Sequence, residues 1–405
     1  MNEPCRIGII GVGQRGGAYI KLARSTPRVE LVALCDTDAC RLHDFAMAYD
    51  CAAVPQFTEP DVMFRVSELD AVVITVPDYL HAEVAVTALR HGMHIMLEKP
   101  MAPTAAECRE ILAARTSKSQ IIQLGFVLRE HPMYKQIKAI VESGRLGQIM
   151  SVAAEESIGV MHGASYMRRW HRKVANSGGF ILAKCSHDID LISWIVDALP
   201  VRVASFGDCN FFRPEKQMAQ FCSVCTDQGC RFRFHGELVV MSEAEKANPS
   251  KSKFDLCVYN ADKDVVDNQV TILEYGNGIR AVFSLNLFAP QAGRTIRLVG
   301  TEGYLEGNTV NNRIKVSSSI GLQPVIYDCQ ADNDSGHGGS DQLFFEEFVR
   351  CICSDIPPKV DYQAGLAATV VGNAIELARS TGKVVRIEPQ EYSLEENRIV
   401  NMDAI

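Results

Sequence analysis

The chain has 405 residues, and at roughly 150 residues per domain this length predicts two or three domains with room for a large core. Its 41 basic and 49 acidic side chains give a formal charge of −8, which disfavours a general affinity for nucleic acid or anionic membranes and favours a small-molecule partner. A hydrophobic content of 47% beside 22% charged residues is ordinary for a globular protein and argues against long disorder.

The fourteen cysteines are the unusual feature of the composition. The first of them, Cys5, opens a buried strand at the position where a signal peptide would need a longer apolar run. We therefore interpret most of them as reduced thiols of a cytoplasmic protein, because disulfides are rare in that compartment. The uncharged stretch at 362–375 is too short and too polar to span a bilayer, so no membrane contact is expected.

The first third of the chain alternates short apolar runs with stretches of helical spacing. Buried parallel strands are expected at 7–10, 31–35, 71–76, 94–97 and 120–126, and helices at 16–25, 37–49, 80–91 and 104–117. Strict alternation of strand and helix predicts right-handed crossovers and a doubly wound parallel sheet of the α/β class.

After residue 128 the strict alternation of strand and helix patterns ends. The pattern predicts a helix at 132–143, two closing helices at 341–353 and 362–381, and strands at 148–157, 201–212, 254–260, 269–275, 279–288, 295–299 and 313–317. Short polar connections such as Tyr275-Gly276-Asn277-Gly278 are typical of antiparallel hairpins. We therefore expect a first domain at 1–128 and an α+β domain with a largely antiparallel open sheet at 129–405. The charged segment 243–253 is interpreted as a surface loop.

The first strand leads directly into Gly11-Val12-Gly13-Gln14-Arg15-Gly16, a G-x-G-x-x-G turn that opens a helix. Gly11 makes the tight turn, Gly13 lets the backbone approach a pyrophosphate, and Gly16 lets helix and strand pack closely. Asp36 follows Gly16 by 20 residues, where its carboxylate can accept both ribose hydroxyls and repel a 2′-phosphate. This arrangement predicts a Rossmann-type NAD(P)-binding domain that favours NAD, while the nearby Arg41 keeps NADP as the less favoured alternative.

Two further strand ends carry chemically distinctive residues. The third strand ends in Thr75-Val76-Pro77-Asp78 with His81 beyond it, and the fourth ends in Glu98-Lys99-Pro100. Open α/β sheets bind ligands at the carboxyl ends of their parallel strands. Cofactor contacts are therefore expected from Thr75, Val76, Pro77, His81, Glu98 and Lys99, and the bond before Pro100 is one that can be cis.

With these motifs the chain resembles the glucose-fructose oxidoreductase, inositol dehydrogenase and rhizopine-catabolism family (Gfo/Idh/MocA). The resemblance covers essentially the whole chain and continues through Gly144-Arg145-Leu146-Gly147, Gly178-Gly179, His187-Asp188-Ile189-Asp190, Gly300-Thr301-Glu302-Gly303 and the helix at 362–382. It implies NAD(P)-dependent oxidoreduction of sugars, cyclitols or their derivatives. It also implies homodimers or homotetramers formed through the open face of the second-domain sheet.

By the same resemblance, Lys99 corresponds to the lysine that touches the nicotinamide ribose and the reacting hydroxyl, and His187 to the catalytic histidine. The family pattern has an aspartate four residues before that histidine, where this chain has Ala183 followed by Lys184. The segment Lys184-Cys185-Ser186-His187-Asp188 resembles a sub-branch with Lys-Cys-x-His-Asp. Trp170-His171-Arg172 and His337-Gly338-Gly339 resemble that sub-branch too.

Hydride transfer at a carbinol carbon needs a group that takes the hydroxyl proton. Our hypothesis is that Lys99 and His187 share this proton, while Lys184 and Asp188 position hydroxyls and tune the pair. If the two lysines converge, the charge of one favours the neutral form of the other. His187 as a helix cap and Lys184 with Asp188 as a structural ion pair stay open as alternatives.

Five further positions complete the expected substrate site. The aromatic face of Trp170 and the neighbouring His171 can stack on the apolar side of a sugar ring, and Arg172 can donate paired hydrogen bonds to hydroxyls or a carboxylate. Arg129 follows the last parallel strand, and His337 stands on a glycine-rich turn, so both can reach the pocket.

Cys222, Cys225 and Cys230 form a compact group with Cys209 and His235 nearby. A C-x-x-C pair with a third thiolate is how a structural zinc site begins, but the spacing shows no clear fourth ligand. We expect packing thiols or a local redox pair in preference to a metal.

Three functions fit these residues. The favoured one is an NAD-dependent dehydrogenase or reductase for a sugar, cyclitol or sugar derivative. The second is a glycosidase or lyase that retains NAD and works by transient sugar oxidation and elimination, and the third is a non-catalytic NAD-binding sensor.

Overall fold

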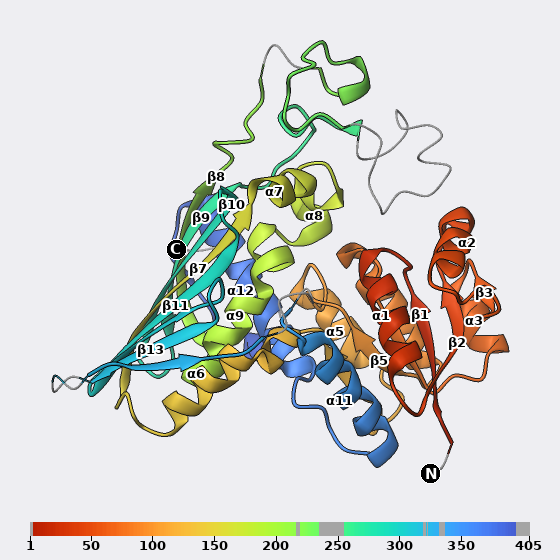
Figure 1. Ribbon diagram of the computed structural model, residues 1–405, viewed down its shortest axis with the longest axis horizontal. Coiled ribbons are helices and arrows are strands. Elements are labelled where there is room, and N and C mark those ends of the chain that lie inside the picture. Colours follow the sequence, from red (N-terminus) through yellow and green to blue (C-terminus); the bar gives the residue numbers. More distant parts are fainter. Residues whose placement is uncertain are drawn as a thin grey trace, which may run out of the picture.

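The computed structural model describes residues 3–215, 219–234, 255–318, 321, 323–331 and 337–393. The charged segment 243–253, Phe254 and His235 lie outside these ranges. Two sheets lie side by side, with helices between and around them (Figure 1).

The first sheet has six parallel strands in the order β3-β2-β1-β4-β5-β6, which confirms the predicted doubly wound α/β fold. Its strands are β1 (Cys5–Ile10), β2 (Val29–Cys35), β3 (Gln56–Phe57), β4 (Ala71–Ile74), β5 (His94–Leu97) and β6 (Ile122–Leu124). Its helices are α1 (Gln14–Ser25), α2 (Ala39–Ala48), α3 (Pro60–Val66), α4 (His81–Arg90) and α5 (Ala105–Ala113). The sequence did not predict β3 and α3, because elements this short show no periodicity. All four residues of β4 are buried, since both faces of a parallel sheet are covered.

The second sheet has nine strands in the order β14-β13-β12-β11-β7-β10-β9-β8-β15. They are β7 (Ile149–Gly159), β8 (Pro200–Asp208), β9 (Asn268–Tyr275), β10 (Arg280–Ala289), β11 (Gly293–Gly300), β12 (Gly303–Asn308), β13 (Arg313–Ser318), β14 (Val325–Asp328) and β15 (Val385–Arg386). Among the described strands of this second sheet, only β7 and β10 pair in parallel. The prediction of a largely antiparallel sheet is therefore confirmed. The predicted hairpin at 275–278 joins β9 to β10, and its Gly278 has φ +86.

Two strand predictions in this domain were wrong in extent or type. The strand expected at 201–212 ends at Asp208, because the Asp267 carboxylate accepts the backbone N–H groups of Asn210, Phe211 and Phe212. The strand expected at 254–260 is absent from the described part, 255–260, where a single bridge joins Leu256 to Phe221 and a turn follows.

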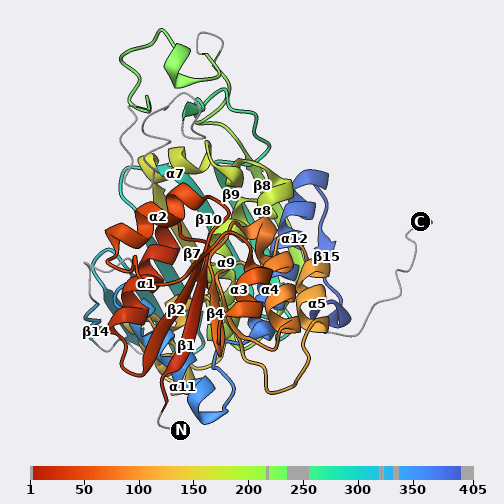
Figure 2. The ribbon, with the colours of Figure 1, turned by 90° about the vertical axis from the view of Figure 1, so that its right-hand side faces the viewer.

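Helices α9 (Phe180–Val196) and α12 (Tyr362–Thr381) cover the face of the second sheet that is turned toward the first domain (Figures 1 and 2). They pack closely, since a Cβ on Gly372 of α12 would stand 2.9 Å from the Cβ of Leu182. No helix was predicted for 180–196, because a helix that is buried along nearly its whole length shows no clear amphipathic period. The other helices of the second domain in this part of the chain are α6 (Pro132–Glu142), α7 (Val160–Tyr166) and α8 (Val174–Ser177).

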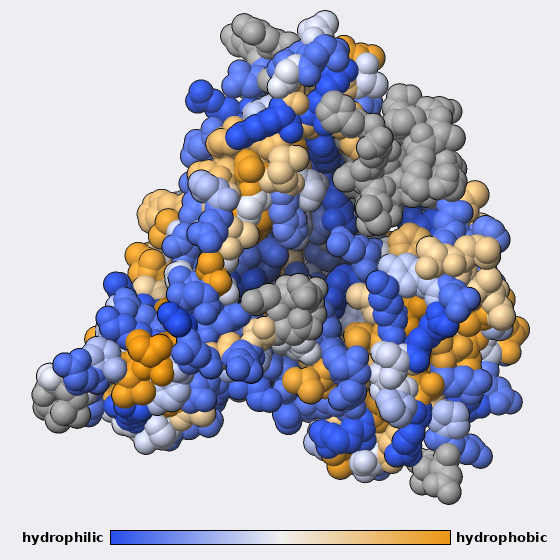
Figure 3. Space-filling view, viewed as in Figure 1, coloured by the Kyte–Doolittle hydropathy of each residue, from blue (hydrophilic) through white to orange (hydrophobic). Residues whose placement is uncertain are grey.

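Helix α11 (Ser340–Ser354) comes late in the chain but packs on the first domain. Phe345 lies 6.1 Å from Tyr19 between ring centroids, and the Phe344 carbonyl accepts a hydrogen bond from Gln123 in β6 at 2.8 Å. The two sheets are thereby held against each other, and Figure 3 shows a hollow between them lined mainly by hydrophilic residues.

Among the helices of the described ranges, none combines the length and the hydropathy that crossing a bilayer requires.

Candidate active site

The glycine-rich loop leaves an open cradle at the start of α1. Gly11 has φ +92, and a Cβ on Gly16 would stand 2.2 Å from the Gly11 carbonyl oxygen, so both positions need glycine. A Cβ on Gly13 would meet nothing within 4 Å. Gly13 is also the N-cap of α1 and offers no side-chain cap, so the first N–H groups of the helix are available to an anion. The residues of the loop therefore fit the pyrophosphate of a dinucleotide.

Asp36 is fixed at the end of β2 beside this loop. Its carboxylate accepts hydrogen bonds from the backbone N–H of Val12 at 2.9 Å and of Asp38 at 3.0 Å. Arg41 lies 3.7 Å from Asp36 and 3.2 Å from Asp38, so its charge is already matched by two carboxylates. This arrangement fits a ribose with free hydroxyls better than one with a 2′-phosphate.

His81 joins the two strand ends that carry the other expected cofactor contacts. Its ring nitrogens lie 2.8 Å from the Pro100 carbonyl oxygen and 3.0 Å from that of Val76, and burial lowers its pKa. Thr75 donates its hydroxyl to the Gly11 carbonyl at 2.5 Å, and the bond from Lys99 to Pro100 is cis. Val76 and Pro77 lead from this point into the turn before α4.

Arg15 and Glu98 form an ion pair beneath the loop. Arg15 Nε donates to Glu98 at 2.8 Å, the Tyr19 hydroxyl donates to the same carboxylate at 2.9 Å, and Arg15 also pairs with Asp341 of α11 at 3.0 Å. Burial alone would raise the pKa of Glu98, but the charge and hydrogen bond of Arg15 together with the charge of Lys99 lower it. The guanidinium of Arg15 therefore has protein partners, and the preceding residue, Gln14, is the first residue of α1.

Lys99 points from the end of β5 to the first turn of α9. Its Nζ donates to the Ala183 carbonyl at 2.7 Å, which brings it beside Lys184. Burial lowers the pKa of Lys99, the charge of Lys184 lowers it further, and Asp78 and Glu98 oppose both effects. Lys99 is thus a lysine whose neutral form is favoured by its surroundings.

His187 lies one turn further along α9. Its ring centroid is 5.8 Å from that of Phe126 and 6.0 Å from that of His337, and its buried Nδ1 has no hydrogen-bond partner within the described chain. Burial and then the charge of Lys99 hold the pKa of His187 well below the ordinary value. A neutral imidazole can accept a proton at one nitrogen.

Behind α9, two strands of the second sheet supply charges that the sequence did not reveal. Arg294 of β11 donates to Asp188 at 2.9 Å and lies 2.5 Å from Glu156 of β7. Lys184 lies 3.7 Å from Glu156. Lys184 and Asp188 thus have Glu156 and Arg294 as their ion-pair partners. Glu156 and Arg294 escaped prediction because a charged residue in a strand ordinarily faces solvent.

The aromatic residues expected at the substrate site form a stack. The rings of Trp170 and His171 lie 3.5 Å apart at an interplanar angle of 22°, and Tyr166 meets His171 edge-on at 4.4 Å. Tyr79, from the turn after β4, lies 6.1 Å from Trp170. Burial lowers the pKa of His171, and the charges of Arg169 and Lys99 add to this effect. The stack therefore lies near the lysine pair.

The remaining three candidates are held by protein groups. The Nε–H of Arg172 donates to the Asp262 carbonyl at 3.1 Å. Arg129 donates two hydrogen bonds to the Asp190 carboxylate, at 2.8 and 2.6 Å. His337 Nδ1 lies 3.0 Å from Asp341, with its ring turned toward that of His187.

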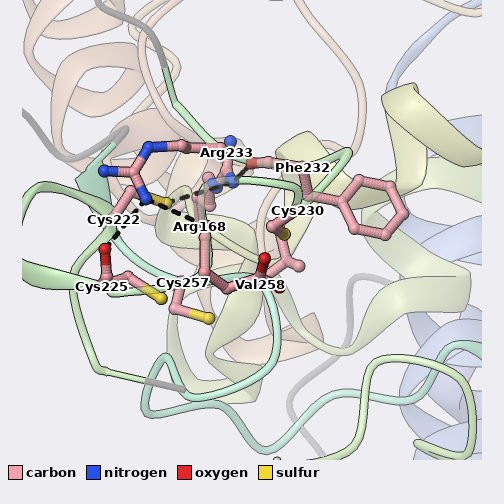
Figure 4. Close-up of a pocket in the computed structure, with 9 residues that line it drawn as sticks. Arg168, Cys222, Cys225, Cys230, Phe232, Arg233, Cys257 and Val258 are labelled. Carbon is pink, nitrogen blue, oxygen red and sulfur yellow. Dashed lines mark hydrogen bonds between the residues drawn. The ribbon is translucent and has the colours of Figure 1, made fainter. Parts of the chain in front are cut away.

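The cysteine group surrounds a separate small cavity (Figure 4). Cys257, which the sequence did not connect with the group, lines this cavity together with Cys222, Cys225 and Cys230. Across the described ranges, no three Cys, His, Asp or Glu side chains are placed to hold a metal ion. All fourteen cysteines fall within these ranges and are free thiols.

A parallel sheet with this loop and this acidic residue defines the class of NAD-binding α/β oxidoreductases. Residues 5–126 match the model of the "Oxidoreductase family, NAD-binding Rossmann fold", and residues 138–387 match its "C-terminal alpha/beta domain". The chain belongs to the Gfo/Idh/MocA oxidoreductase family.

Relatives support this membership. The chain is 27% identical over 384 residues to YteT of Bacillus subtilis, which is named as an oxidoreductase, and the match covers 87% of this chain and 89% of the relative. It is 30% identical over 194 residues to inositol 2-dehydrogenase of Salmonella typhimurium, but this match covers only 47% of the chain and 54% of that enzyme.

Solved structures show the same fold. Levoglucosan dehydrogenase in complex with NADH matches with a TM-score of 0.73 at 16% identity, covering 95% of this chain and 100% of that one. myo-Inositol 2-dehydrogenase from Lactobacillus plantarum matches with a TM-score of 0.69 at 22% identity over the same shares.

Proposed function

We propose that this NAD-dependent oxidoreductase transfers a hydride between NAD and a carbinol or keto carbon of a sugar, cyclitol or sugar derivative. The observation that carries the proposal is the convergence of the half-buried Lys99 and the buried His187, both with lowered pKa, beside a dinucleotide loop. NAD, when bound, accepts or returns the hydride.

In the direction of oxidation the substrate hydroxyl loses its proton as the hydride leaves its carbon. Neutral Lys99 takes this proton at Nζ, and His187 shares it. Lys184 and Asp188, fixed by Glu156 and Arg294, position the neighbouring hydroxyls. In reduction the same groups return the proton to the new hydroxyl.

Binding is assigned to two groups of residues. NAD is held by the loop Gly11 to Gly16, by Asp36 and by the strand ends with Thr75, Val76, Pro77, His81, Glu98 and Lys99. The substrate is bound beside Trp170 and His171, with Arg129, Arg172 and His337 supporting the pocket walls. We place the division between the two domains near residue 128 and assign the chain to the sub-branch with Lys-Cys-x-His-Asp.

We further propose a cytoplasmic homo-oligomer formed through the open face of the second sheet. Phe206, Val270, Ile272 and Val282 are 43–70% exposed on neighbouring strands of this face. Contiguous exposed apolar groups of this kind mark interaction surfaces.

The test is a panel of polyols, sugars and aryl glycosides with NAD and NADP, followed by absorbance and product analysis. We expect net NADH formation, and Lys99→Met should cut turnover by at least ~100-fold, the usual range for general catalysis. A rate near that of the unmodified enzyme would remove Lys99 from the mechanism. Glycoside cleavage without net NADH would favour the NAD-retaining hydrolase or lyase. NAD binding without any turnover would favour a sensor.

A further inference from the structure

Two adjacent arginines differ sharply in how the fold satisfies them. Arg168 donates Nε to the Leu256 carbonyl at 2.7 Å, reaches the Phe232 carbonyl with Nη2 and lies 3.7 Å from Cys222 Sγ (Figure 4). Among the described residues, Arg169, the next in the chain, has no carboxylate within ion-pair distance and no side-chain hydrogen-bond partner. Its Nε is buried and without a partner, although the residue as a whole is half-buried.

A buried guanidinium N–H without a partner is costly, because the desolvation penalty of a charged donor is not repaid. Burial lowers the pKa of Arg169 accordingly. Buried polar atoms that the protein leaves unsatisfied in a cleft are atoms for which a ligand can supply the partner.

The unpartnered Nε of Arg169 lies close to the candidate active site. It directly precedes the Trp170 and His171 stack, and Tyr166, which meets His171 edge-on at 4.4 Å, is also influenced by the Arg169 charge. The charges of Arg169, Lys99 and Lys184 all act on the rings of His162 and His171. The three side chains therefore lie near one another beside the aromatic stack.

In the described part of the chain, none of the acidic groups nearby forms an ion pair with Arg169. Glu156 and Asp188 are engaged by Arg294, at 2.5 and 2.9 Å. Asp78 is the carboxyl group that acts on Arg169, and burial raises the pKa of Asp78 well above the ordinary value, which favours its neutral form. Arg169 is thus left beside the aromatic stack without a carboxylate partner within the described ranges.

We propose that Arg169 forms a carboxylate-binding subsite and that the substrate is an acidic sugar, a uronate or a related sugar acid. The inference rests on the proposed hydride transfer at the same site and names its substrate class. An arginine fork matches the two oxygens of a carboxylate, while Lys184 supports the charge from α9. The sugar ring then lies against Trp170 and His171 with the reacting hydroxyl toward Lys99.

The experiment compares substrates that differ only in the carboxylate. D-galacturonate with D-galactose, and D-glucuronate with D-glucose, are tested for turnover with NAD and for binding to the enzyme–NADH complex by calorimetry. We expect tighter binding and higher kcat/KM for the hexuronates. Arg169→Gln should lower both by about 10- to 100-fold for the hexuronates, the range of charge-assisted hydrogen bonds, and change the values for the hexoses by less than about threefold.

Two further variants sharpen the result. Arg169→Lys keeps the charge but not the fork, so it should recover only part of the hexuronate affinity. Arg90→Gln removes an exposed arginine at the end of α4 and should leave the discrimination unchanged. Equal NADH affinity and thermal midpoints show that Arg169→Gln is folded.

The outcomes separate this proposal from the catalytic one. Hexuronate binding that depends on Arg169 without any turnover would support the subsite and contradict the dehydrogenase. Turnover of hexoses with no preference for hexuronates would overturn the subsite and leave the dehydrogenase standing. Absence of hexuronate binding to the enzyme–NADH complex would also overturn the subsite.

Discussion

At the scale of single residues, Lys99 shows how neighbouring groups change the pKa of a lysine, as the proposed acid–base role requires. Its ammonium form is disfavoured first by burial and then by the charge of Lys184, while Asp78, Glu98 and Cys185 act in the opposite sense. Only the neutral form can accept the substrate proton. Oxidation should therefore fail at low pH, as Lys99 becomes protonated.

This pH dependence provides a test. Lys184→Met removes a neighbouring cation, so the pKa of Lys99 should rise and the neutral form should need a higher pH. We expect the acid limb of the kcat/KM profile for oxidation to move to higher pH. Profiles of both proteins measured with a neutral polyol would check this, and an unmoved limb would contradict the coupling between the two lysines.

The glycine-rich loop offers a matched pair of substitutions. Gly13→Ala places a methyl group where no protein atom lies within 4 Å, so it should lower stability by no more than about 1 kcal/mol, the N-cap preference for glycine over alanine. NAD affinity should fall, because the methyl occupies the pyrophosphate cradle. Gly16→Ala brings a Cβ to 2.2 Å from the Gly11 carbonyl and should lower the thermal midpoint itself. Calorimetric NAD titrations and thermal unfolding separate the two effects. Unchanged NAD binding by Gly13→Ala would contradict the assignment of the cradle.

The sequence could predict those site residues that stand in a local motif. Gly11 to Gly16 and Asp36 follow from the first strand, turn and helix, and Lys99 and His187 follow from the family resemblance. Glu156, Arg294 and Arg169 could not be found in this way, because their importance lies in partners from distant strands or in the lack of a partner. Asp78 stood within a recognised segment, but nothing in its neighbours along the chain reveals its burial beside Lys99 and Arg169.

At the scale of elements, helix α9 carries Lys184, His187 and Asp188 and is buried along nearly its whole length. Its position depends on close packing with α12, where Gly372 faces Leu182. A methyl group at 372 would stand 2.9 Å from the Leu182 Cβ, which cannot rotate away.

Gly372→Ala should therefore destabilise the protein by about 1–3 kcal/mol, the usual cost of overpacking. Differential scanning calorimetry would show a lower midpoint, together with a lower turnover as α9 shifts. Leu377→Ala, at a side chain of the same helix that is 52% exposed, is the control and should stay within about 0.5 kcal/mol. A Gly372→Ala midpoint equal to that of the control would show that α9 can move without cost.

Element prediction succeeded where patterns were long and failed where packing decided the structure. Apart from the short β3 and α3, the strands and helices of the first domain and α12 follow their periodicity. Strand β12 was missed because Gly303 and Gly307 weaken its strand pattern. Its strand conformation is stabilised by antiparallel pairing with β11 and β13 on either side.

At the scale of the whole molecule, the second sheet has two unlike faces. Leu273, Ala281 and Phe283 are buried on the face turned toward the helices. On the other face Ile272 pairs with Val282, and Val270 pairs with Phe206, all substantially exposed. Strand alternation places the four side chains together on one surface.

If this surface joins protomers, Ile272→Glu should convert the oligomer to monomers, because the interface would bury an unpaired carboxylate. Analytical ultracentrifugation measures the change, and Met161→Glu, at an exposed side chain of α7 away from this sheet face, serves as the control. An oligomer unaffected by Ile272→Glu would locate the contact elsewhere.

The sequence by itself determined the alternation that makes the parallel sheet, the glycine loop and acidic residue that fit NAD, and the family through its local motifs. These features depend on residues near one another in the chain. Only the tertiary structure decided which charges face one another: it set Lys99 beside Lys184, paired Asp188 and Glu156 with Arg294, and left Arg169 without a partner. The physical reason is that electrostatic effects depend on distance and burial in three dimensions, and residues from β5, β7, α9 and β11 meet only after both sheets have packed.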